Sequence, residues 1–115
     1  MRYMLLIYGN ENAAPESNAD DGLKEWFDYT QWLVDQGWME AGAPLEPTAT
    51  ATTVRAKDGK VVTTDGPFAE TKEQLGGYYV VDCANLDEAI EAAGRCPGAR
   101  YGTMEVRPIR ELPGM

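Results

Sequence analysis

Charged residues around Asp65 form the first group that could do chemistry. Asp65 precedes a Gly-Pro pair, and Glu70 and Lys72 follow in the same short segment. A tight turn could hold the Asp65 carboxylate at the mouth of a pocket, with Glu70 as a second base and Lys72 as a contact for an acidic ligand. The structural alternative is an Asx turn, which already explains the Asp, Gly and Pro, followed by a solvated charged surface. If the functional interpretation holds, Asp65 and Glu70 are candidate catalytic residues and Lys72 is a candidate ligand-binding residue.

The second group lies on the predicted strand Thr103–Arg107. Glu105 and Arg107 are two residues apart, so an extended backbone places both on one face. If that face is covered, the two charges must pair with each other, with a neighbouring strand or subunit, or with a ligand. Arg107 is the best candidate to hold a carboxylate or phosphate oxygen, Glu105 is a candidate base, and the Tyr78 ring is a candidate ligand contact.

Composition excludes several classes of function. The 115 residues include 10 Lys and Arg, 19 Asp and Glu and no histidine, which gives a formal net charge of -9. Nucleic acids and anionic membranes require clustered basic residues, so we expect neither as a partner. Without histidine the chain lacks the commonest general base and the usual nitrogen ligand of transition metals. We expect no metal site and no organic cofactor.

Hydrophobic periodicity predicts an alternation of strands and helices. Continuous apolar runs are typical of strands buried on both faces, and a 3.6-residue period is typical of a helix. An Asp-Gly pair between two β-branched runs is a strong hairpin signal. The predicted elements are strand 3–8, helix 21–37, an extended stretch 38–41, a loop 42–47, a hairpin of strands 48–55 and 61–64, one or two helical turns at 69–74, strand 78–83, helix 86–96 and strand 103–107.

This order predicts one α+β domain over residues 1–115, a ferredoxin-like split βαβ sheet with both helices on one face. Such helices bury only one face of the sheet, yet strands 3–8 and 78–83 are apolar on both. The second face needs a cover, and a chain of this size finds it most simply in an identical sheet. We therefore expect a two-fold homodimer.

The N-terminal apolar run and the two cysteines bear on the compartment. The run Tyr3–Tyr8 is too short for a signal peptide or a membrane span, so we expect a cytoplasmic protein with no membrane partner. Cys83 and Cys96 lie at the end of a predicted strand and of the helix that follows it. At roughly 1.5 Å per helical residue they are about 15 Å apart, too far for a disulfide. Both are expected to be reduced, structural thiols.

The segment Asp65–Glu73, with sequence DGPFAETKE, resembles the YCII-related, DGPF-domain family, which is named after its first four residues. The resemblance extends to Met1–Tyr8, Pro47–Arg55, Leu75–Tyr79 and Glu105–Ile109. It covers nearly the whole chain and implies a ferredoxin-like protomer that forms a dimeric α+β barrel.

The resemblance also implies two kinds of function. Some members of the broader family resemble small enzymes that act on cyclic or chlorinated aromatic compounds through a His–Asp pair. This chain has no histidine, and Cys96 stands before Pro97 where those members have the aspartate. DGPF members are also encoded beside or fused to extracytoplasmic-function sigma factors, which implies a regulatory role.

Two hypotheses follow. The first is a dimeric module that binds a small acidic or aromatic molecule and acts with a protein partner in transcription regulation. The second is an isomerase- or lyase-type enzyme in which Asp65, Glu70 or Glu105 is the base and Arg107 or Lys72 stabilises charge. A purely structural role would require a fully packed barrel.

Overall fold

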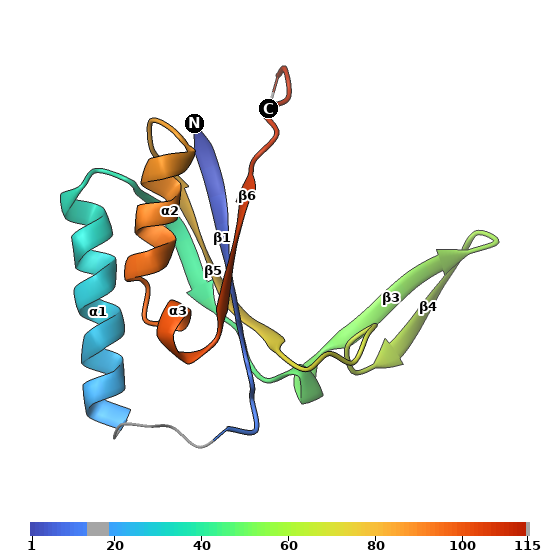
Figure 1. Cartoon of the computed structure of the whole chain (residues 1–115). Helices are drawn as coiled ribbons and strands as arrows, with labels where there is room; N and C mark the ends of the chain where they lie inside the picture. Colours follow the sequence, from blue (N-terminus) through green and yellow to red (C-terminus); the bar gives the residue numbers. More distant parts are fainter. Residues whose placement is uncertain (14–18, 115) are drawn as a thin grey trace.

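The structure is a computed structural model that describes residues 1–13 and 19–114. Figure 1 shows a sheet with helices on one side and a hairpin that stands away from it. The elements in chain order are β1 (Arg2–Gly9), α1 (Ala19–Asp35), β2 (Met39–Pro44), the 3-10 turn η1 (Thr48–Thr50), β3 (Thr52–Lys57), β4 (Lys60–Asp65), β5 (Gln74–Asp82), α2 (Leu86–Arg95), α3 (Gly98–Tyr101) and β6 (Thr103–Pro108).

The main sheet has the strand order β2-β5-β1-β6, and all neighbours are antiparallel. This is the order of a split βαβ fold, because β1 lies between β5 and β6 while β2 forms an edge. Helices α1 and α2 lie on the same side of the sheet (Figure 1). The predicted α+β, ferredoxin-like protomer is confirmed.

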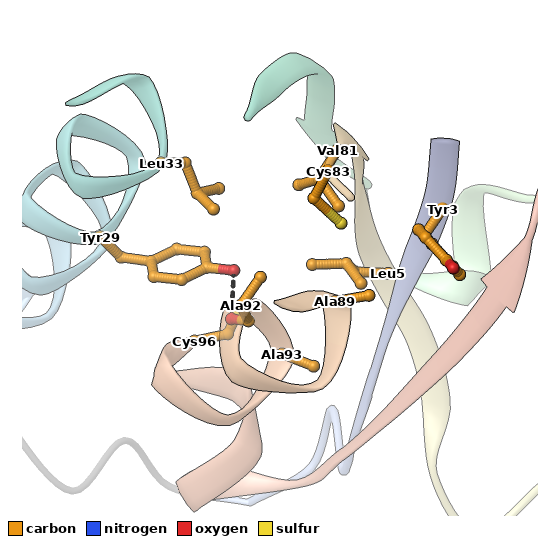
Figure 2. Packing of buried hydrophobic residues seen from close by; sticks show 10 residues of the cluster. All are labelled: Tyr3, Leu5, Tyr29, Leu33, Val81, Cys83, Ala89, Ala92, Ala93 and Cys96. Carbon is orange, nitrogen blue, oxygen red and sulfur yellow. Dashed lines mark hydrogen bonds between the residues drawn. The ribbon is translucent and has the colours of Figure 1, made fainter. Parts of the chain in front are cut away.

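The hydrophobic core fills the space between this sheet and its helices (Figure 2). Leu5 on β1, Val81 on β5 and Leu33 on α1 are completely buried there. Because side chains alternate along a strand, Tyr3 and Leu5 face the helices while Met4 and Leu6 face the other way. The core therefore accounts for one face of each central strand only.

Helix α2 begins with a variant of the capping box. The Asn85 side chain accepts a hydrogen bond of 3.0 Å from the backbone N–H of Glu88, and the Glu88 carboxylate accepts one of 2.7 Å from the Ala84 N–H. These contacts satisfy donors that a helix leaves free at its start. Small side chains then form the buried stripe of α2, which lets the helix approach the sheet closely. They are Ala89, Ala92 and Ala93.

The hairpin β3–β4 is confirmed and forms a separate two-stranded sheet. Asp58 and Gly59 both have positive φ, 52° and 78°, as a type I′ turn requires. Its first strand begins at Thr52, later than predicted, because Thr48–Thr50 form a 3-10 turn behind Pro47. Apart from Thr53, every residue of the two strands is exposed.

Four local predictions are wrong. Residues 69–74 form no helical turn but bends that lead into β5, which starts at Gln74 instead of Tyr78. The glycines of β5 fit strand positions because Gly77 lies against the β2 backbone, where an added Cβ would lie 3.1 Å from the Ala43 oxygen. Strand β2 continues to Pro44, which an edge strand tolerates because no further strand needs its missing N–H. The short helix α3 follows Pro97, where a further loop was expected.

The structure also bears on the predictions of unpaired thiols and of a chain without a membrane span. Cys83 and Cys96 are both buried and unpaired, as expected. Among the described residues, no helix combines the length and apolar character needed to cross a bilayer.

The close approach of Gly102 to β1 gives a test of this packing. A Cβ at Gly102 would overlap the backbone oxygen of Tyr8, and neither backbone can easily move. Gly102→Ala should lower the free energy of unfolding by about 2–3 kcal/mol in urea titrations. The matched control is Gly94→Ala in α2, where an added Cβ meets nothing within 4 Å and should stabilise the helix by up to about 1 kcal/mol. Equal stability of the two variants would contradict the packing described here.

Candidate functional site

Three of the predicted site residues come together on the sheet face that the helices do not cover, here called the open face. In the sheet, Leu6 on β1 pairs with Tyr78 on one side and with Glu105 on the other. Two residues earlier on β1, Met4 pairs with Arg107. Paired residues of antiparallel strands share a face, so Tyr78, Glu105 and Arg107 surround the same stretch of β1.

Glu105 and Arg107 pair with each other. Arg107 Nη1 lies 3.3 Å from Glu105 Oε2, and the two side chains are 44% (Glu105) and 69% (Arg107) exposed. The ion-pair alternative is therefore the one that the protomer adopts, although the partners are on one strand rather than on two. An exposed pair of this kind contributes little to stability, about 0–1 kcal/mol, so the guanidinium can exchange its partner at small cost.

The floor of the open face is apolar. Met4, Leu6 and Tyr8 from β1 alternate with the core residues, and Val80 of β5 lies opposite Met4. All four are half-buried or buried by their neighbours in the sheet, without any helix over them. The face thus offers a hydrophobic surface that is edged, on the β6 side, by the carboxylate of Glu105 and the guanidinium of Arg107.

Sequence reasoning missed a second charged cluster on this face. Arg2 contacts Glu40 and Glu111, each at 3.0 Å, and the hydrogen bond from Arg2 lowers the pKa of the Glu111 carboxyl. The sequence could have placed Arg2 on this face, because Arg2, Met4 and Leu6 follow one another at intervals of two residues along β1. Its partners lie far away in the sequence and could not be assigned without the topology.

Asp65, Glu70 and Lys72 do not belong to the open face. Asp65 is the last residue of β4 and pairs with Thr52 of the hairpin, while Glu70 and Lys72 lie exposed in the segment that leads back to β5. Among the described residues, no hydrogen bond or ion pair links Asp65 or Glu70 to Glu105, whose side chain pairs with Arg107.

The Asp65-Gly66-Pro67-Phe68 motif forms the base of the hairpin. The Gly66 N–H donates to the Ala51 oxygen at 2.7 Å, and the Thr53 hydroxyl donates to the Gly66 oxygen at 2.8 Å. These bonds support a structural turn. An open groove of about 500 Å³ lies beside it, lined by β3, Pro67 and Phe68 and by none of the six candidate residues. Phe68 is 80% exposed and so is not part of the core.

Cys96 and Tyr29 lie inside the core. The Tyr29 hydroxyl donates a 2.7 Å hydrogen bond to the Ala92 oxygen at the C-terminal end of α2 (Figure 2). Burial raises the pKa of the Cys96 thiol to about 11, and it also raises the pKa of Tyr29. A thiol kept neutral and away from solvent is inert, so Cys96 is a packing residue.

No metal centre is evident in the part of the chain that the structure describes. There, no three Cys, Asp or Glu side chains come close enough to hold an ion together.

Comparison with known proteins identifies the family. The model of the YCII-related domain matches residues 1–113. The chain belongs to the YCII-related family. An uncharacterized protein of Rhizobium meliloti (strain 1021) is 39% identical over 116 residues, covering 95% of this chain and 92% of its own length. The family assignment that the motifs suggested is thus confirmed over nearly the whole length.

The buried thiol predicts a loss of stability at alkaline pH. Cys96 has a higher pKa when folded than its ordinary value of 9.0, so folding favours the protonated form. That contribution is complete below about pH 9 and is lost as the pH rises toward 11, because the unfolded chain releases the proton first. Between pH 8 and pH 10.5 the free energy of unfolding should fall, and Cys96→Ala should remove about 1–2 kcal/mol of that fall. An identical pH dependence in wild type and variant would contradict the assignment.

Proposed function

We propose that this YCII-related protein is a homodimer that binds a small acidic or aromatic molecule between two open sheet faces. The observation that carries the proposal is the composition of the open face. Met4, Leu6 and Tyr8 lie where no helix covers them, and the Glu105–Arg107 pair stands beside them. A monomer would keep this apolar surface in contact with water, which is unfavourable.

A second copy is the cover that fits this face best. The face spans the central strands β1 and β5 and the edge strand β6, so an identical sheet can pack on it about 10 Å away. Two-fold symmetry then places the same apolar patch of both copies in contact. It also brings both Glu105–Arg107 pairs to the margin of the enclosed space.

The side chains around that space define the class of ligand. The Arg107 guanidinium already holds a carboxylate, that of Glu105, and a ligand carboxylate or phosphate could replace it with the same geometry. Tyr78 lies next to this pair across Leu6 and offers a ring for stacking. A small aromatic acid satisfies both contacts at once.

The regulatory part of the proposal rests on the resemblance of Asp65–Glu73 to the DGPF group. We expect the ligand-bound dimer to act with a protein partner in transcription regulation, in the manner of modules linked to sigma factors. The net charge of -9 favours contact with a protein rather than with nucleic acid. A cytoplasmic location, expected from the short N-terminal apolar run, fits such a partner.

An isomerase- or lyase-type reaction is the alternative for the same face. Glu105 would be its base and Arg107 would stabilise the developing charge. Asp65, Glu70 and Lys72 would take part only if the second copy brought them near. The two functions differ in a simple readout, because a binding protein returns its ligand unchanged whereas an enzyme converts it.

Benzoate is a suitable probe of the site because it combines a ring with one carboxylate. Saturation-transfer NMR should detect its binding to the wild type, and Arg107→Gln should weaken binding by about tenfold or more through loss of a charge-assisted contact. Arg110→Gln removes a nearby exposed charge outside the sheet and should leave binding unchanged. Equal binding by wild type and Arg107→Gln would overturn the assignment of this site.

A further inference from the structure

Among the described residues, no other strand or helix packs extensively against the hairpin β3–β4. Its strands pair only with each other, and nearly all of their residues are exposed. A lone two-stranded hairpin is at best marginally stable in water. The hairpin also extends the molecule, whose radius of gyration is 16.2 Å, against about 13 Å for a compact domain of this length.

The two faces of the hairpin differ in character. Val54, Ala56 and Val61 lie on one face, where Val54 and Val61 are 61% and 70% exposed. The other face carries basic residues, and Lys57 lies directly opposite Lys60. Like charges in that position repel each other, so an acidic surface placed against them would stabilise the hairpin.

The direction of the hairpin indicates where such a surface could come from. Figure 1 shows that the hairpin leaves the end of the sheet where β2 finishes and β5 starts, and that it projects to the side opposite the helices. The hairpin therefore stands at an angle to the open face, at one end of the sheet, and the space between the two is called the corner here. Any second copy that covers the open face must sit in this corner.

We infer that the hairpin is an arm that reaches across to a second copy of this chain, an inference that rests on the proposed homodimer. A strand of six residues is about 20 Å long, whereas packed sheets lie about 10 Å apart. The arm therefore closes one end of the space between the sheets, and its tip reaches the helix layer of the partner.

Charge complementarity favours a second copy as the occupant of the corner. Residues 52–65 contain three of the ten basic residues of the chain and two of its 19 acidic ones. The rest of the chain thus has seven basic and seventeen acidic residues. In the helix layer, α2 alone carries Asp87, Glu88 and Glu91 against Arg95. The tip is therefore the basic part of an acidic protein and fits the helices of its own partner.

The arm would also complete the ligand site. Phe68, at its base, is the most exposed large hydrophobic residue among those described, and it lines the open groove beside β3. Covering it by the partner explains why an aromatic ring occupies this position. The arm of one copy would then close one end of the space between the sheets, which would otherwise be open to solvent.

The double variant Lys57→Glu/Lys60→Glu tests the arm without changing the turn. Sedimentation equilibrium at about 50 mM salt should give a dimer dissociation constant about tenfold or more above that of the wild type, and the difference should shrink at about 300 mM salt. The matched control Asp58→Asn keeps a residue suited to the turn and makes the tip more basic, so its dimer should be as tight as wild type or tighter. A double variant that dimerises as tightly as the wild type at low salt would overturn the inference.

Hydrogen exchange separates failure of the arm from failure of the dimer. In a wild-type dimer the amides of β3 and β4 should exchange more slowly than in Leu6→Glu, which places a charge on the open face. A wild-type dimer with equally fast exchange in the hairpin would overturn the arm inference and leave the dimer intact. A wild type that is itself monomeric would overturn both.

Discussion

The central constraint on this protein is that its sheet has two apolar faces but its helices cover only one. Leu5 on β1 and Val81 on β5 are completely buried under α1 and α2. Met4 and Leu6, which flank Leu5 on β1 and point to the opposite face, have no such cover. Alternation along a strand makes this unavoidable once β1 lies in the middle of the sheet. The remaining features of the molecule can be understood as responses to that open face.

The position of the charged residues follows from it. Glu105 and Arg107 share the open face with Met4 and Leu6, and they satisfy each other's charge at its margin. Such a pair is stable in the protomer yet easily opened, because it is exposed and on one strand. A face that is apolar in the middle and charged at the edge suits both a second sheet and a small acidic ligand. The Asp65-Gly66-Pro67-Phe68 motif has a structural role away from this face, because the Gly66 N–H holds the base of the hairpin by its hydrogen bond to the Ala51 oxygen.

Much of the fold could be predicted from the sequence, because its strongest signals are local. The apolar run at β1 and the Asp58-Gly59 turn each act within a few residues, and each is found where expected. The predicted helical turns at residues 69–74 failed for the opposite reason. Their conformation is set by β5, which starts at Gln74 because it pairs there with Gly9, a contact distant in sequence.

The candidate site was predictable in part. The two-residue spacing of Glu105 and Arg107 correctly placed them on one face, away from the core residues of the same strand. Whether Asp65 belonged to the same site depended on the position of the hairpin, which no local pattern determines. The cluster of Arg2 with Glu40 and Glu111 was missed because three distant segments meet there.

The oligomeric state is the most direct test of this account. Sedimentation equilibrium of the wild type at micromolar concentration should give twice the chain mass of 12.6 kDa, and Leu6→Glu, which buries a charge in the proposed interface, should give the chain mass itself. Circular dichroism should show that the variant keeps its secondary structure. A wild type that sediments as a monomer at micromolar concentration would contradict the claim that the open face is covered by a second copy.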